Sequence, residues 1–232
     1  MQQQPFSVPD SVLSLAKRKK QAQSLVRQAV KKYGAMKHRK NRPPLNELIL
    51  NLLYRSTSVR RATRALRALK RDFVDWNELR ISHPGEVAGR ISSAPWARQA
   101  AERIIWLLRT VYEQYNRTGL EFLGELTPTQ ARSCMQSLPA VDRSLADAVL
   151  LMSLNVPVLP LSGDGARMCH RLGLLPNARP TIKNQNALTK LIDEDYYPCL
   201  SLFFCDIAEK VCLPDDPACR QCPMRRNCPS RQ

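Results

Sequence analysis

Residues 138–150 read LPAVDRSLADAVL. Pro139 interrupts the helix before it and forces a corner, and an amphipathic helix resumes at about Arg143 and continues to Leu154. A tight corner between two helices presents backbone N–H groups to an anion, so the stretch is suited to holding a nucleic-acid backbone. Whether chemistry follows depends on the side chains around it.

Helical periodicity continues on both sides of this corner. The preceding helix is predicted to open at Thr127, because Pro128 suits its first position and Gln130 completes a capping box. Apolar side chains at helical spacing predict further helices over 11–33, 45–56, 59–73 and 98–115. The most strand-like run, VPVLPL, is short and interrupted by proline. The expected fold class is all-α.

The chain carries a formal net charge of +16, from 36 Lys and Arg against 20 Asp and Glu. Eleven cations lie in residues 1–42 beside the single acid Asp10, and seven lie between Arg55 and Arg71 with no acid among them. A single such run usually marks a solvated helix face. Two runs in one basic chain favour a polyanion. Nucleic acid is favoured over a membrane, because no amphipathic segment places exposed Trp or Phe beside its cations.

The composition is that of a globular helical protein, with 232 residues of which 44% are hydrophobic and 6% aromatic. No apolar run approaches about 18 residues, so no membrane span is predicted. The first residues, MQQQPFSVPD, lack the charged and apolar regions of a signal peptide. We therefore expect a cytoplasmic or nucleoid-associated protein.

The eight cysteines fall into two groups. Four are scattered through apolar helical segments and are interpreted as core thiols: Cys134, Cys169, Cys199 and Cys205. The other four lie within CLPDDPACRQCPMRRNC, at Cys212, Cys219, Cys222 and Cys228. Four crowded thiolates repel one another unless a metal centre neutralises them, and disulfides are not expected inside a cell. The spacing is compatible with zinc and with a four-iron cluster, and its six-residue gap favours iron–sulfur.

These features together resemble the endonuclease III family of helix-hairpin-helix DNA glycosylases. The cysteine loop resembles that family's four-iron cluster loop, and LPAVDRSLADAVL resembles its hairpin and following helix. The stretch 157–176, PVLPLSGDGARMCHRLGLLP, is similar to the segment in which a catalytic aspartate precedes a helix. The stretch 45–58, LNELILNLLYRSTS, is similar to the helix that carries lesion-pocket and DNA-wedge residues. The resemblance extends from about residue 22 over nearly the whole chain.

The resemblance implies two helical lobes flanking a DNA cleft. Residues 43–156 would form a six-helix lobe that contains the hairpin. Residues 1–42 would return to pack with 157–232 as an iron–sulfur cluster lobe, with its loop at 212–228. The implied cofactor is a [4Fe-4S] cluster on the four clustered cysteines. The implied partner is double-stranded DNA, intact or damaged, bound by a monomer.

Three catalytic positions of the family hold residues that lack its chemistry. Ser144 replaces the lysine that forms a Schiff base in bifunctional members, so AP-lyase activity is not expected, although adenine-specific relatives also carry serine there. Ser162 replaces an aspartate that stabilises charge at the sugar or activates water, and Asp164 follows two residues on. Asn51 replaces the glutamate that protonates the leaving base in adenine-specific members. Ser162 and Asp164 are also typical helix-capping residues.

The hairpin departs from the family as well. Its two glycines are Ala140 and Asp142 here, and alanine suits the corner only if its φ stays negative. The Asp142 carboxylate opposes a phosphate unless it caps the next helix, with Arg143 as a partial offset. By resemblance, the DNA-binding residues are Ser56, at the wedge position, and Pro139, Ala140, Val141 and Arg143.

Three functions are compatible with this pattern. The first is a DNA-binding relative of endonuclease III that has lost standard glycosylase and lyase chemistry. The second is an active monofunctional glycosylase that releases an unusual or labile base with non-standard residues. The third is a redox-sensing iron–sulfur protein that only inherits the fold.

Overall fold

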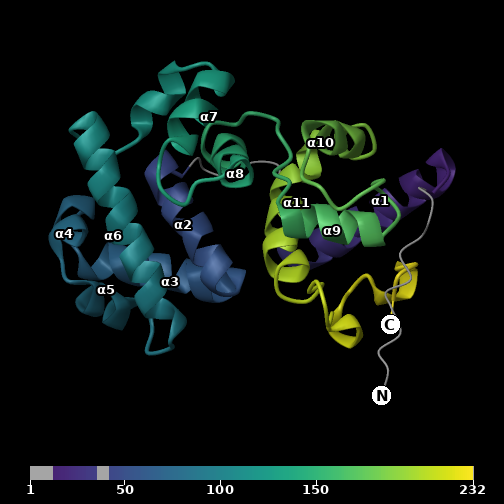
Figure 1. Ribbon diagram of the computed structural model, residues 1–232, viewed down its shortest axis with the longest axis horizontal. Coiled ribbons are helices and arrows are strands. Elements are labelled where there is room, and N and C mark those ends of the chain that lie inside the picture. The colour runs from purple at the N-terminus through teal and green to yellow at the C-terminus, as the bar shows by residue number, and fades with distance from the viewer. Residues whose placement is uncertain (1–12, 36–41, 232) are drawn as a thin grey trace. The chain divides into compact units, whose positions relative to one another are not determined.

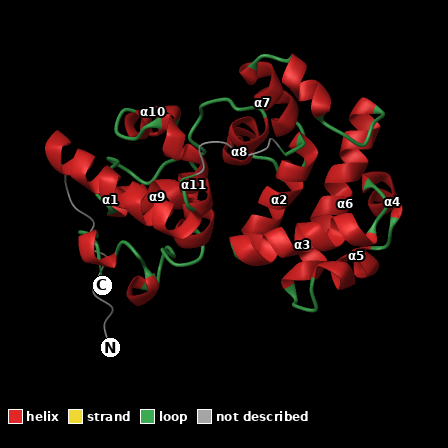
Figure 2. Cartoon of the chain, turned by 180° about the vertical axis from the view of Figure 1, so that it is seen from behind, coloured by secondary structure: helices red, strands yellow, loops and turns green. Residues whose placement is uncertain are grey.

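The computed structural model describes residues 13–35 and 42–231, and every regular element in those ranges is helical (Figures 1 and 2). The expected all-α fold class is therefore confirmed. The chain divides into two compact units, one made of α1 with the residues from Leu159 onward, the other ending at Val158. Within the described ranges, no helix combines the length and apolarity that crossing a membrane requires.

The unit that ends at Val158 is built around one buried helix. Its elements are α2 (Pro44–Ser56), α3 (Val59–Asp72), α4 (Trp76–Ile81), α5 (Pro84–Ile91), α6 (Trp96–Tyr115), a 3-10 turn (Glu121–Glu125), α7 (Pro128–Gln136) and α8 (Arg143–Ser153). Helix α2 packs against α3, α6 and α8. All of its side chains from Leu45 to Tyr54 are buried, as the apolar run predicted.

This unit holds seven α-helices in its described part, where six were expected. The two that periodicity did not reveal, α4 and α5, have six and eight residues, fewer than about three helical turns. Both are started by local caps. The Asp75 carboxylate accepts hydrogen bonds from the N–H groups of Asn77 and Glu78, and the His83 ring accepts one from Gly85. A capping side chain can start a helix that is too short to show an apolar periodicity.

The helix boundaries predicted around the corner are confirmed. The Thr127 hydroxyl accepts from the N–H of Gln130, whose side chain accepts in return from the N–H of Thr127. Pro128 occupies the first helical position. The second helix begins at Arg143 and ends one residue before Leu154.

The other unit joins the first described helix to the C-terminal part of the chain. Its elements are α1 (Leu15–Tyr33), α9 (Gly163–Arg171), α10 (Ile182–Thr189), a 3-10 turn (Glu194–Tyr196), α11 (Tyr197–Phe203), a π-helical turn (Phe204–Ala208) and two 3-10 turns (Cys219–Gln221 and Arg225–Asn227). Helix α1 packs against α11. The Tyr33 hydroxyl and Lys32 both bind the Asp206 carboxylate, so α1 is also fixed by polar contacts.

The buried face of α1 is not purely apolar. Leu15 is 60% exposed, whereas Gln21 and Ser24 are buried. Both polar side chains are used by one residue near the C-terminus: Gln21 donates to the carbonyl of Asn227 at 2.7 Å, and the Asn227 amide donates to the Ser24 hydroxyl at 2.5 Å. A helix that packs on a loop buries groups able to satisfy the loop's polar atoms, and apolar periodicity does not report them. Val12, in the segment 11–33 predicted as helical, lies outside the described residues.

Candidate nucleic-acid interface and cysteine site

The corner lies between Gln136, which ends α7, and Arg143, which begins α8. Val141 is buried and anchors the corner, while Ala140 is exposed at its tip with φ of 60°. The condition of a negative φ at this alanine is therefore not met. A side chain with a Cβ in the left-handed region is disfavoured by about 1–2 kcal/mol. The corner keeps a backbone suited to glycine although its residue is alanine.

Asp142 is the N-cap of α8, and its carboxylate accepts from the N–H of Leu145 at 2.9 Å. The same carboxylate pairs with Arg55 of α2, whose Nη2 lies 2.5 Å from Oδ2. Arg55 also approaches the Ala140 carbonyl, with Nη1 at 3.5 Å. Arg55, and not Arg143, therefore neutralises the charge of Asp142. The sequence pattern could not indicate this pairing, because the two residues are far apart along the chain.

Arg143 is instead directed to an acid on its own helix. Its Nε lies 3.7 Å from Oδ2 of Asp147, a residue only 1% exposed. Arg132 of α7 reaches the other oxygen of Asp147 at 2.6 Å. Asp147 thus joins the two helices that flank the corner and orients both arginines. The pair of Arg132 and Asp147 could not be predicted from the sequence, because a separation of 15 residues across the corner gives no periodic signal.

The predicted positions in α2 and α8 lie within the same unit, on helices that pack together. Asn51 is buried, and its amide donates to the carbonyl and to Oε1 of Glu47, both at 2.9 Å. Glu47 is 1% exposed, and Arg42 pairs with its other oxygen. Ser144 is half-buried in the first turn of α8. Ser56 is half-buried at the end of α2, with its hydroxyl 3.4 Å from the Leu52 carbonyl.

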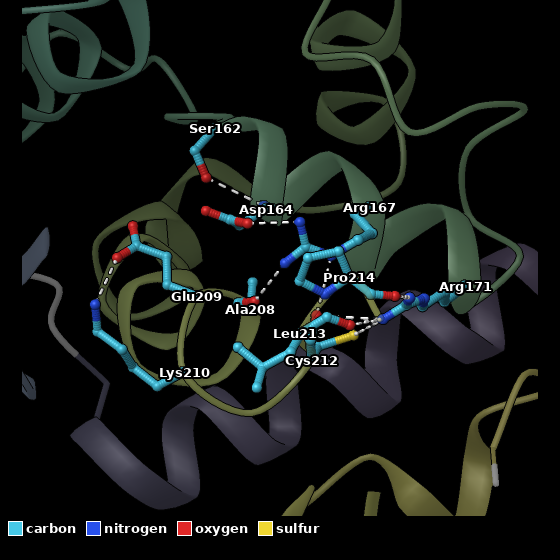
Figure 3. A network of polar contacts seen from close by, with 11 residues as sticks. Ser162, Asp164, Arg167, Arg171, Ala208, Glu209, Lys210, Cys212, Leu213 and Pro214 are labelled. Carbon is cyan, nitrogen blue, oxygen red and sulfur yellow. Dashed lines mark hydrogen bonds and ion pairs between the residues drawn. The ribbon is translucent and has the colours of Figure 1, made fainter. Parts of the chain in front are cut away.

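The remaining predicted site residue, Ser162, lies in the other unit, at the start of α9 (Figure 3). Ser162 is the N-cap, and its hydroxyl accepts from the N–H of Gly165 at 3.1 Å. Asp164 lies in the first turn and pairs with Arg167, with Oδ1 and Nη1 2.6 Å apart. The predicted capping role is therefore confirmed for Ser162, whereas Asp164 forms an ion pair within α9 instead of capping it. Position 162 therefore has no carboxylate, and the nearby carboxylate of Asp164 is already paired.

Two arginines of α9 hold the segment that carries the first clustered cysteine (Figure 3). Arg167 donates to the carbonyls of Ala208 and Cys212, each at 3.0 Å. Arg171 is 7% exposed and donates to the Cys212 carbonyl and to its Sγ, at 3.2 and 3.4 Å, and to the carbonyls of Leu213 and Pro214. The two guanidinium groups therefore fix the backbone on both sides of Cys212.

The four clustered cysteines line one small cavity, beside Arg171 and Arg225. Burial raises the pKa of the Cys228 thiol to about 11, and it also raises the pKa of Cys222. Thiols in this state become anions only where a nearby cation compensates the buried charge. Among the described residues, no three side chains of His, Cys, Asp or Glu converge tightly enough to ligate one metal ion. The four cysteines border a common cavity.

The scattered cysteines are only partly the core thiols expected. Cys169 and Cys199 are fully buried, and burial raises the pKa of both, that of Cys199 to about 11. Cys134 and Cys205 are half-buried, so the core interpretation is wrong for these two. Cys134 lies near the end of α7, and Cys205 lies in the π-helical turn. Apolar neighbours in the sequence do not by themselves place a residue in the core.

A larger cavity of about 280 Å³ opens at the N-terminal end of α2, lined by Asn46, Lys70, Trp76 and Glu121 among others. The Trp76 Nε1 donates to the Asn46 side-chain oxygen at 2.7 Å, which fixes one wall. None of the predicted site residues lines this cavity.

The fold of this chain is similar to that of a solved DNA-bound protein. A solved structure of a non-covalent endonuclease III–DNA complex superposes with a TM-score of 0.62 at 20% identity, covering 91% of this chain and 95% of that one. The described architecture is accordingly the helix-hairpin-helix fold of endonuclease III. No protein-family model matches the sequence.

Two relatives are similar to this chain in sequence over most of its length. Endonuclease III of Thermotoga maritima is 26% identical over 206 residues, covering 89% of this chain and 91% of the relative. Endonuclease III of Synechocystis is 26% identical over 190 residues, covering 82% of each chain. The chain is thus similar to these two endonucleases III over most of its length, and similar in fold to a solved one.

Proposed function

We propose that this protein binds double-stranded DNA through its hairpin and lacks the standard glycosylase and AP-lyase chemistry of its relatives. The relatives and structural neighbours support a DNA-binding role in base-excision repair. The loss of chemistry is our inference from the residues at the catalytic positions.

The observation that carries this proposal is at Ser162. The family places a carboxylate here, and a carboxylate can hold charge against a cationic sugar or accept a proton from water. The Ser162 hydroxyl carries no charge and already accepts a hydrogen bond from Gly165. Asp164 does not substitute for it, because its carboxylate is paired with Arg167.

The other two positions support the same conclusion. A hydroxyl at Ser144 cannot form an imine with an abasic sugar. The Asn51 amide is committed to Glu47 and has no acidic proton to transfer. Glu47 is the nearest buried acid, and both of its oxygens have partners, from Asn51 and Arg42.

For DNA contact we propose Ser56 with the corner residues Pro139, Ala140, Val141 and Arg143. The corner at Ala140 has a left-handed backbone, the kind of conformation found in anion-binding corners. Arg55 neutralises the Asp142 carboxylate, so the acid that replaced a glycine does not leave net negative charge at the corner. This removes the strongest electrostatic objection to phosphate binding there.

We further propose a [4Fe-4S] cluster on Cys212, Cys219, Cys222 and Cys228. Their shared cavity supports a common metal centre. Zinc and a four-iron cluster both accept four thiolates, and the six-residue gap between Cys212 and Cys219 favours the cluster. When bound, such a cluster ties together a segment whose regular structure is limited to short 3-10 turns.

An oligonucleotide experiment tests the proposed function. The protein is incubated with duplexes that carry single defined lesions, and the DNA is then treated with hot alkali to reveal abasic sites. We expect binding to the duplexes in a gel-shift assay and no alkali-labile sites above a no-protein control. Alkali-labile sites at one lesion would overturn the proposal in favour of a monofunctional glycosylase. Absence of any duplex binding would favour the redox-sensing alternative.

A further inference from the structure

Four arginines form a straight stripe along α3. Arg60, Arg64, Arg67 and Arg71 follow one another at spacings of four, three and four residues, which keeps them on one face of a helix. All four are exposed. The opposite face is apolar and buried by packing against α2 and α5, so the stripe is held outward over about 16 Å of helix.

The stripe is electrostatically unfavourable for the protein by itself. With Arg61 and Lys70 beside it, α3 contains like-charged pairs at i,i+3 and i,i+4 along its whole length, each of which destabilises a helix. Its first turn carries arginines and no acid, at the end where the helix dipole is already positive.

Acidic partners for the stripe are scarce. Only Arg71 is paired, with the adjacent Asp72 at 2.6 Å; no described residue forms an ion pair with Arg60, Arg64 or Arg67. A ligand that supplies negative charge would therefore relieve a repulsion that the fold leaves in place.

We infer that the α3 stripe is a second phosphate-binding surface, which holds duplex DNA outside the corner at 138–142. The inference rests on the proposed DNA binding and extends it to a separate element. A duplex presents one phosphate charge per about 1.7 Å of its axis, so a stripe of this length faces several phosphates at once. Arginine suits them, because its planar fork can bind a phosphate with two hydrogen bonds.

A membrane surface fits the stripe less well. Lipid-binding helices place large apolar side chains beside their cations. The exposed large apolar side chains of the described residues lie on other elements, for example Trp106 on α6 and Ile81 on α4. The face of α3 next to the arginines carries none of them.

The test compares two charge-matched triple variants by the salt dependence of duplex binding. The stripe variant is Arg60→Gln, Arg64→Gln and Arg67→Gln; the control is Arg98→Gln, Arg103→Gln and Arg117→Gln, on and just after α6. Each lost phosphate contact lowers the slope of log K against log salt by about 0.9, so we expect a loss of up to about 2.7 for the stripe variant. The control should change the slope by less than one unit.

Thermal unfolding gives a second readout. Without DNA at low salt, the stripe variant should unfold at a higher temperature than the wild type, because repulsion is removed. Added duplex should raise the unfolding temperature of the wild type more than that of the stripe variant.

An Arg143→Gln variant at the corner separates the two proposals. If it weakens binding while the stripe variant keeps the wild-type slope, the stripe inference is wrong and the proposed function stands. If the wild type does not bind duplex DNA at all, both fail. Equal losses of slope in the stripe and control variants would mean that binding depends only on the net charge of the protein, and this outcome would also overturn the inference.

Discussion

Arg55, in the last turn of α2, holds the carboxylate of Asp142, the N-cap of α8, with Nη2 and Oδ2 2.5 Å apart. The pair connects the end of a buried helix to the corner that faces DNA in our proposal. It also explains how an acid can occupy a position where a relative has glycine: one oxygen caps α8 and the other is neutralised.

This pair predicts opposite effects from its two partners. Asp142→Asn keeps a capping side chain and removes the charge, so stability should change by less than about 1 kcal/mol while duplex binding tightens. Arg55→Gln leaves the carboxylate uncompensated and should weaken binding. Binding titrations of both single variants and the double variant measure this. If Asp142→Asn weakens binding, the carboxylate is itself needed for the DNA-binding geometry.

The left-handed alanine predicts a stabilising substitution. Ala140→Gly should raise the free energy of unfolding by about 1 kcal/mol, because it removes the Cβ strain at φ of 60°. Ala68→Gly, inside α3, is the control and should lower it by about 1 kcal/mol. Urea unfolding of both variants gives the comparison. Destabilisation by Ala140→Gly would mean that the corner does not hold this φ in solution.

The catalytic positions predict that lyase chemistry can be restored. The wild type should form no borohydride-trapped adduct with an abasic duplex above the background from surface amines. Ser144→Lys with Ser162→Asp should form one well above background, since it supplies the amine and the carboxylate. Aspartate is also a good N-cap, so α9 should keep its start. Ser144→Lys alone should trap less.

Denaturing gels after borohydride treatment quantify the adduct. Trapping by the wild type at the level of the double variant would reveal an amine already placed at the site. The proposal that the standard chemistry is lost would then have to be abandoned.

The spacing of the four clustered cysteines predicts an iron–sulfur cluster rather than a zinc ion. The purified protein should be yellow-brown, absorb near about 400 nm and contain iron and sulfide in equal amounts. Cys219→Ser should lose the iron and much of the soluble yield. Cys134→Ser, at a half-buried thiol outside the loop, is the control and should keep both. One zinc and no iron per chain would contradict the prediction.

The long helices were predictable because their signals are local. The capping box at Thr127 and the apolar run of α2 are read directly from neighbouring residues. The short helices α4 and α5 were missed because their caps, Asp75 and His83, act over fewer residues than a period needs.

The site was less predictable because its contacts connect distant residues. The capping roles of Ser162 and Asp142 follow from positions just before a helix. The partners Arg55 and Asp147 do not. Arg55 reaches Asp142 from α2, and Asp147 meets Arg132 across the corner. The sign of φ at Ala140 was also beyond the sequence, because the packing of two helices imposes it against the residue's own preference.

Helix α1 completes a unit whose other parts come at the far end of the chain. Gln21 and its partner Asn227 are 206 positions apart. At about 5–20 residues per second, a ribosome makes the second roughly 10 to 40 s after the first. Until α11 is made, α1 lacks the helix on which it packs, whereas every helix of the unit that ends at Val158 is made before α11. Biosynthesis therefore orders the two units in time, and the cysteine loop can close only after the helices of both have been made.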